Sequence, residues 1–149
     1  MDNLKLRTAV VAALADVEAV KAKLTSLLTE IEGTETVDLG RQGRWTKAQV
    51  ALVWSRVDHL PGVQALFAAT AERPDEKVTF TEIIERSGLA ERQQANEHAA
   101  LSRISAQLFQ EKRWPIENSQ GSIDSATGKA EMLYWMDGRI ARWWLDITA

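Results

Sequence analysis

The segment from Ala90 to Glu111 carries the side chains with the most suggestive chemistry. At 100° per residue, one face of a helix here would present guanidinium and amide groups around a single alanine. This polar stripe consists of Arg92, Asn96, Ala99, Arg103, Gln107 and Gln110. An arginine can donate two hydrogen bonds to O6 and N7 of guanine, and an amide can pair with N6 and N7 of adenine. No acidic residue interrupts the stripe, so its chemistry suits the base edges of duplex DNA.

A second interpretation of the polar stripe stays open at this point. A polar face on an exposed helix is what any amphipathic helix shows. Glu91, Glu97 and Glu111 flank the stripe and would repel phosphates. Glu97 also projects toward the side that the spacing predicts to be buried, which consists of Ala90, Leu101, Ile104 and Leu108.

Basic residues elsewhere are candidates for contact with the phosphate backbone. The segment from Leu39 to Val57 holds four cations and no acid. The candidates are Arg44, Lys47, Arg113 and Lys129. The expected hairpin loop over 119–130 carries one cation, Lys129, and one anion, Asp124, so a strong contact from that loop is not indicated.

Catalytic and metal-binding patterns are missing from the sequence. There is no cysteine, and the two histidines, His59 and His98, lie far apart in the chain. The glycine-rich phosphate loop, the serine-hydrolase elbow and the His-x-x-x-His pair are also absent. The acids of Pro74-Asp75-Glu76-Lys77 are contiguous in a turn and diverge, so they cannot converge on one metal ion. We therefore expect no enzyme, no cofactor and no metal site.

The elements that must position the polar stripe follow from capping residues and from a change of hydrophobic period. Thr46 with Gln49, and Thr79 with Glu82, are capping boxes, and Gly88 is a helix-ending glycine. The expected order is a helix over 46–59, a turn at 60–62, a second helix that is closed by 73–77, a strand over 78–80, a helix ending at Gly88, a helix over 90–111, strands over 113–118 and 131–136, and a last helix capped by Asp137. That order is typical of a winged helix-turn-helix.

The first 33 residues have a different pattern, with a helix predicted over 3–31 and ended by Gly33. Its apolar residues repeat every seven, as in a coiled coil, and Asp16 would face Lys21, and Asp2 would face Arg7, in a parallel dimer. The seam residues expected to pair two copies are Val10, Val17, Val20, Leu24, Leu27 and Ile31. Leu14 and Leu28 broaden the apolar face, so packing of this helix on its own domain is the alternative.

The predicted fold class is therefore α+β, mainly α with a small β-hairpin. It is a winged helix-turn-helix preceded by a long N-terminal coiled-coil helix. Three parts are expected: a dimerisation helix over 1–33, a linker over 34–43 and the winged domain over 44–149. Core packing is expected for most of the six tryptophans, whereas Trp45 and Trp143 are less easily buried, and one of them is expected at the junction of the helix with the domain or at a subunit interface.

Several short stretches carry a resemblance that covers residues 44–146. They are Arg44-Trp45-Thr46, the segment from Ala71 to Phe80, Gly88-Leu89, Ala100-Leu101-Ser102-Arg103 and Trp114-Pro115. Together they resemble an uncharacterised actinobacterial family of small proteins with a winged-helix-like domain. The resemblance implies a fold and no catalytic residue. Most winged helices bind DNA through the third helix and the hairpin, and a minority bind proteins.

Charge and composition limit the functional choices. Residues 1–40 carry four Lys/Arg against seven Asp/Glu, and residues 41–149 carry fourteen of each, so neither part is basic overall. The cysteine-free composition and the absence of a long apolar run predict a cytoplasmic protein without a membrane span. We expect a homodimer that binds duplex DNA as a transcriptional regulator or repressor. The alternative is an adaptor that docks a protein partner through the winged domain and the N-terminal helix.

Overall fold

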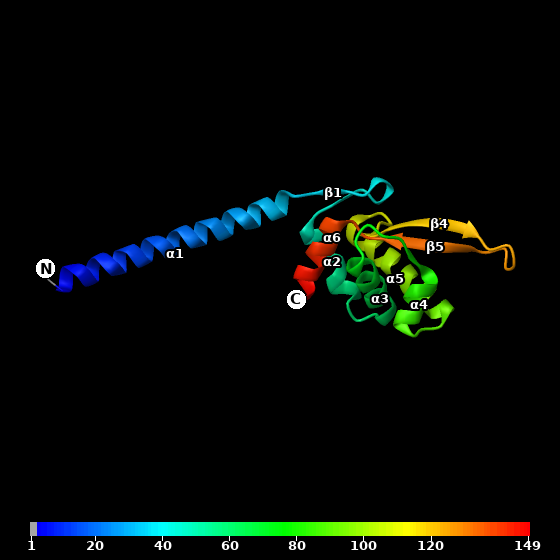
Figure 1. Cartoon of the computed structure of the whole chain (residues 1–149). Coiled ribbons are helices and arrows are strands. Elements are labelled where there is room, and N and C mark those ends of the chain that lie inside the picture. The colour runs from blue at the N-terminus through cyan, green and yellow to red at the C-terminus, as the bar shows by residue number, and fades with distance from the viewer. Residues whose placement is uncertain (1–2) are drawn as a thin grey trace. The chain divides into compact units, whose positions relative to one another are not determined.

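The structure is a computed structural model that describes residues 3–149, except for the side chains of residues 28, 29 and 31–33. The chain is mainly helical with small antiparallel sheets (Figure 1), which confirms the α+β class. It divides into two units, residues 1–35 and residues 36–149.

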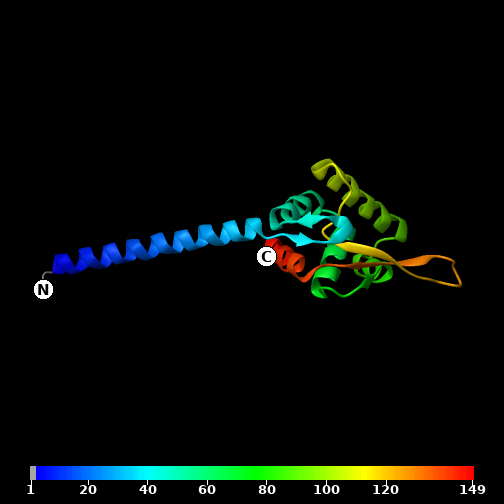
Figure 2. The same ribbon diagram turned by 90° about the horizontal axis from the view of Figure 1, so that it is seen from above.

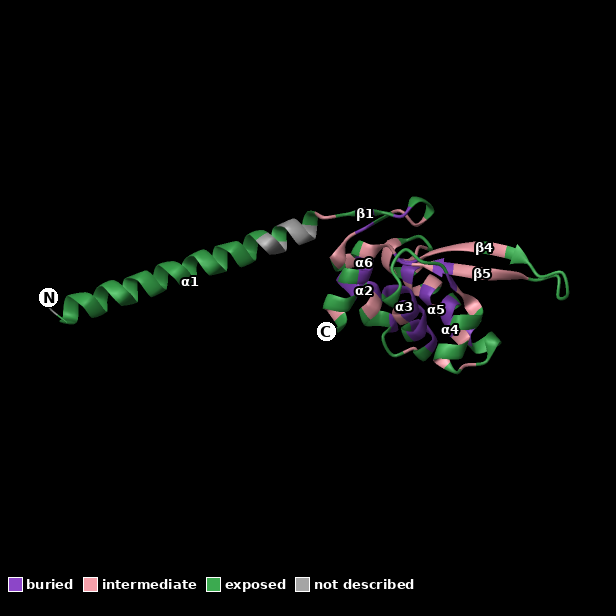
Figure 3. Cartoon of the chain, in the orientation of Figure 1, coloured by how far each residue is buried: buried purple, intermediate pink, exposed green. Residues whose placement is uncertain are grey.

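The first unit is one helix, α1, which spans Asn3–Thr34. The helix predicted over 3–31 is confirmed, but it does not end at Gly33. One glycine costs a helix only about 1 kcal/mol, so a long helix can continue through it. The seam side chains that the structure describes are 44% to 61% exposed (Figure 3): Val10, Val17, Val20, Leu24 and Leu27. Ile31 has no described side chain, and Asp2 lies outside the described residues.

Among the described residues, no helix combines the length and the apolar character that crossing a membrane requires.

The second unit begins with a small hairpin. Strands β1 (Val37–Asp38) and β2 (Arg44–Trp45) pair antiparallel around the 3₁₀ turn η1 (Gly40–Gln42). The linker predicted over 34–43 is therefore wrong from Val37 onward. Glycines of positive φ lie at both ends of the turn, at 59° and 77°, and they bring the chain back on itself. This return buries Val37, Leu39 and Trp45 in the core.

Helices α2 (Lys47–Val57), α3 (Pro61–Glu72) and α6 (Gly138–Thr148) form the core of the second unit. The capping box of Thr46 and Gln49 is present, and Asp137 accepts a hydrogen bond from the Arg139 backbone N at 2.8 Å at the start of α6. The ring of Trp54 packs against Phe67 and Trp144, with centroids 5.0 and 5.3 Å apart.

Two tryptophans differ from expectation. Trp45 is fully buried and Trp143 is 4% exposed, so both belong to the core rather than to a junction or an interface. Phe109, which is distant in sequence, meets the ring of Trp45 edge-on at 5.5 Å. Helical periodicity within one element does not reveal such partners.

The main sheet has the strand order β3-β5-β4 with antiparallel pairs, and Figure 2 shows its β4–β5 hairpin. Its strands are β3 (Val78–Thr79), β4 (Glu117–Ile123) and β5 (Ala130–Trp135). The strand predicted over 113–118 begins four residues late, because Pro115 has no N–H to donate. The loop predicted over 119–130 shrinks to 124–129. Gly121 lies inside β4, where a Cβ would stand 2.6 Å from the Glu131 carbonyl oxygen, so this glycine permits close strand approach rather than marking a turn.

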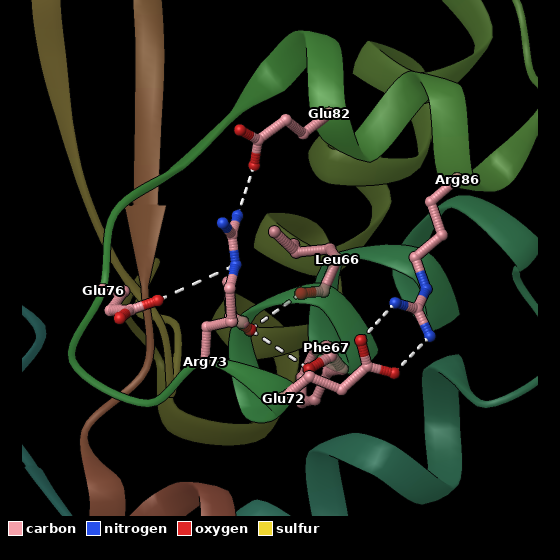
Figure 4. A network of polar contacts seen from close by, with 8 residues as sticks. Leu66, Phe67, Glu72, Arg73, Glu76, Glu82 and Arg86 are labelled. Carbon is pink, nitrogen blue, oxygen red and sulfur yellow. Dashed lines mark hydrogen bonds and ion pairs between the residues drawn. The ribbon is translucent and has the colours of Figure 1, made fainter.

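Helices α4 (Phe80–Ser87) and α5 (Glu91–Phe109) are joined by a short turn at Gly88, whose φ is 72°. Ion pairs hold α4 against the C-terminal end of α3 (Figure 4). Arg86 donates two hydrogen bonds of 2.6 Å to Glu72. These bonds lower the pKa of Glu72 and raise the pKa of Arg86. Arg73 donates a single hydrogen bond to Glu82 near the start of α4, so both ends of α4 are fixed.

Candidate functional site

The buried face of α5 is more polar than its sequence predicts. Of the expected inward residues, Leu101 is buried, Ile104 and Leu108 are half-buried and Ala90 is exposed. The rest of the buried face consists of Gln94, Glu97, His98 and Ser105. Polar side chains are tolerated there because most of them find hydrogen-bond partners inside the fold.

Gly62, in the first turn of α3, is the partner of two of these side chains. Both carboxylate oxygens of Glu97 accept from the Gly62 backbone N, at 3.1 and 3.2 Å, and Gln94 Nε2 donates to the Gly62 carbonyl oxygen at 2.9 Å. The N-cap residue of α3, Leu60, has no side-chain cap of its own. Glu97 therefore caps α3 from another helix, where a carboxylate also complements the helix dipole. This explains why an acid projects toward the core.

The polar stripe lies on the side of α5 away from this buried face. All six of its residues are exposed, namely Arg92, Asn96, Ala99, Arg103, Gln107 and Gln110. The structure thus brings the four candidate base-reading side chains together on one surface. Within the described part of the chain, none of these four has a side-chain hydrogen bond or an ion pair. Because Glu97 is buried against α3, the acids that still flank the stripe at its surface are Glu91 and Glu111.

The residues predicted to contact phosphates differ in their exposure and in their partners. Arg44, on β2, and Lys129, just before β5, are exposed. Lys47 is half-buried, and its Nζ lies 3.4 Å from Asp146 Oδ2 on α6.

Arg113 does not fit a role in phosphate contact. Its side chain is only 11% exposed. One guanidinium nitrogen donates to the Arg44 carbonyl oxygen at 2.7 Å and to Gln49 Oε1 at 3.0 Å. The guanidinium also lies over the rings of Trp45 and Phe109, 4.3 and 4.7 Å from their centroids. Arg113 therefore joins β2, α2 and α5, a task that its place in the sequence does not reveal.

A cavity of about 590 Å³ lies beside the stripe-bearing helix, between α4, the N-terminal half of α5 and the β4–β5 hairpin. His98 lines it, and the rings of Phe80, Trp114 and Tyr134 surround His98 with centroids 5.3 to 5.5 Å away. Sequence reasoning named none of these three aromatic residues as site residues. They come from separate elements that only the tertiary structure joins.

Burial sets the charge states in this cavity. Burial lowers the pKa of His98 to about 4, so the imidazole is neutral at pH 7. Gln94 Nε2 donates to His98 Nε2 at 2.8 Å, which places the imidazole proton on Nδ1. Burial, together with the charge of Glu131, raises the pKa of Tyr134 to about 12. Both side chains are therefore neutral hydrogen-bonding groups at pH 7.

Among the described residues, no group of three or more His, Asp or Glu side chains is placed to hold a metal ion. Comparisons with protein-family models, with curated proteins and with solved structures found no match for this chain.

Proposed function

We propose that the chain is a winged-helix DNA-binding protein that acts as a homodimeric transcriptional regulator or repressor. The observation that carries this proposal is the exposed polar stripe on α5, the second helix of the pair that turns at Gly88. The element order β3-α4-α5-β4-β5, with β5 central in the sheet, is the arrangement expected of a winged helix-turn-helix.

In this proposal α5 enters the major groove. Arg92, Asn96, Arg103 and Gln107 then read base edges, and the small side chain of Ala99 lets the helix approach closely. Lys129 on the hairpin and Arg44 on β2 contact phosphates, and Lys47 joins them by leaving Asp146. Arg113 has no part in the contact.

The proposed dimer forms through α1. A helix that exposes a repeated row of large apolar side chains is typical of an interaction surface. A second copy is the partner that the sequence favours, because Asp16 and Lys21 occupy facing charged positions in a parallel pair. Two copies of α5 would then read two half-sites one or more helical turns apart.

A protein-docking adaptor is the second candidate, and the charge distribution favours it. Residues 41–149 carry no net charge, and two of the expected phosphate ligands, Lys47 and Arg113, have acceptors within the chain. DNA-binding proteins usually gain much of their affinity from unpaired cations. In the adaptor, α1 itself is a binding helix for a partner protein.

Fluorescence anisotropy with labelled, mixed genomic fragments tests the DNA proposal. We expect the full chain to bind, with an affinity that falls steeply as salt rises. Arg92→Ala combined with Arg103→Ala should weaken binding at least about tenfold, since each base-reading arginine contributes about 1–3 kcal/mol.

The control replaces two exposed arginines of α6, by Arg139→Ala and Arg142→Ala. It removes the same charge from a different helix, so we expect less than a twofold change. Equal weakening by both double variants would mean that charge alone, and not the stripe, drives binding. An intact dimer that binds no fragment even at low salt would rule out the DNA proposal and favour the adaptor.

A further inference from the structure

The cavity beside α5 has the size of a small-molecule site, with an apolar inner part and polar residues at its opening. Its volume of about 590 Å³ lies within the range of about 300 to 1,000 Å³ typical of ligand pockets. Buried or half-buried residues form its inner part, chiefly Phe80, His98, Trp114, Met132 and Tyr134. The exposed residues among its lining are polar apart from Ala95. An occupant would therefore place an apolar body inside and a polar group toward the opening.

The inner wall of the cavity is a packed cluster of aromatic rings, against which an aromatic ligand can lie. The rings of Trp114 and Tyr134 are nearly parallel, at 12°, with centroids 6.1 Å apart. His98 meets both of them edge-on and is neutral at pH 7, so it does not repel a cation. Aromatic rings attract cations as well as other rings.

The charged residues of the lining favour a positively charged ligand. The charged residues that line the cavity are three carboxylates, from Glu91, Asp124 and Glu131, and one ammonium group, from Lys129. Glu131 is held in place, because its Oε1 accepts from the backbone N and the hydroxyl of Thr81 at 2.9 and 2.8 Å. Its other oxygen has no hydrogen-bond partner among the described residues.

One hydroxyl of the cavity lining also has no hydrogen-bond partner among the described residues. Tyr134 is 4% exposed and lines the cavity, and its hydroxyl makes no hydrogen bond to any residue that the structure describes. Among the described residues, the buried side-chain atoms without a partner belong to Gln94, Arg113 and Trp144, so the Tyr134 hydroxyl is accessible from the cavity, where a ligand N–H can donate to it. Tyr134 lies close enough to Glu131 for the carboxylate to raise the pKa of the phenol.

We propose that this cavity binds a small aromatic amine in its protonated form, with the ring among Phe80, Trp114 and Tyr134 and the ammonium group at Glu131. This site does not depend on DNA binding, and it stands or falls separately from the proposed function.

Calorimetric titration of the full chain with three probes of similar size tests the proposal at pH 7. Benzylamine is protonated at that pH, benzyl alcohol is neutral and benzoate is negatively charged. We expect benzylamine to bind at least about tenfold more tightly than benzyl alcohol, and benzoate not to bind detectably. Rising salt should weaken benzylamine binding, because the carboxylates of the lining attract it through charge.

Two variants locate the site. Glu131→Gln removes the charge but keeps an amide oxygen that can accept from Thr81, so we expect circular dichroism to be unchanged and benzylamine binding to weaken about tenfold. The matched control, Glu85→Gln, removes an exposed carboxylate of α4 that does not line the cavity, and should leave binding unchanged.

Tyr134→Phe is a second, milder variant that removes only the hydroxyl, and it should weaken benzylamine binding two- to fivefold. Three results would overturn the proposal: no benzylamine binding, equal affinity for benzyl alcohol, or equal effects of Glu131→Gln and Glu85→Gln.

Discussion

At the scale of single residues, the buried polar side chains of α5 affect how the stability of the chain depends on pH. His98 lies among three aromatic rings and accepts a hydrogen bond from Gln94. The folded chain therefore keeps this imidazole neutral, whereas the unfolded chain protonates it near its ordinary pKa of 6.5. This difference links the free energy of unfolding to pH.

The sign of that link follows from the direction of the shift. The pKa of His98 is about 4 in the folded chain, so as pH falls from 7 the unfolded state takes up the proton first and stability is lost until about pH 4. His98 alone should lower the free energy of unfolding by about 2 kcal/mol between pH 7.5 and pH 5. Urea unfolding at both pH values should give a smaller loss for His98→Gln than for the wild-type chain.

His59→Gln is the matched control, because His59 is exposed on the surface. It should behave like the wild-type chain at both pH values. If His98→Gln lost as much stability as the wild-type chain on acidification, His98 would not be the group that responds to pH.

At the scale of elements, the sequence predicts where most helices begin. It predicts few of the contacts that the buried side chains make between helices. Thr46, Thr79 and Asp137 cap through neighbours two or three residues away, so local sequence contains the whole interaction. Glu97 instead caps α3 across 35 residues, and Arg113 reaches Arg44 across 69. The polar stripe could be found because its members share one helix. The cavity could not, because its walls come from four segments.

The link between α3 and α5 depends on the missing side chain of Gly62. A Cβ at this position would stand 2.5 Å from Glu97 Oε2 and 2.8 Å from Gln94 Oε1, and both side chains are buried. Gly62→Ala should therefore destabilise the chain by about 2 kcal/mol in urea unfolding. Glu97→Ala should cost about 1 to 2 kcal/mol through loss of the cap.

The double variant separates a steric clash from a simple loss of flexibility. Glu97→Ala removes the nearer obstacle, so the double variant should lose about 1 kcal/mol less than the sum of the two single variants. Strict additivity would mean that Gly62 and Glu97 contribute independently.

At the scale of the whole molecule, the two units differ in what they bury. The second unit has a continuous apolar core, whereas the described side chains of α1 remain exposed. A helix of this kind gains most of its stability from a partner surface. The regular spacing of its apolar residues could be predicted from the sequence, but the identity of the partner depends on contacts that a single chain does not contain.

Substitutions in the full chain test the proposed pairing. Val17→Lys with Leu24→Lys places charges on the seam and should convert a dimer to a monomer in light scattering. Val11→Lys with Ala15→Lys adds the same charge outside the seam and should leave the dimer intact. A dimer that survives the seam variant would place the contact between copies elsewhere.

The pairing of β1 with β2 also sets how far the amino-terminal side of the second unit can be trimmed. A truncation that starts at residue 44 would delete β1 and leave β2 without its pairing strand. It would also remove the buried side chains of Val37 and Leu39 and the Gln42 carbonyl oxygen, to which the indole of Trp45 donates at 3.1 Å. The shortest fragment that keeps the β1–β2 hairpin must therefore begin before Val37.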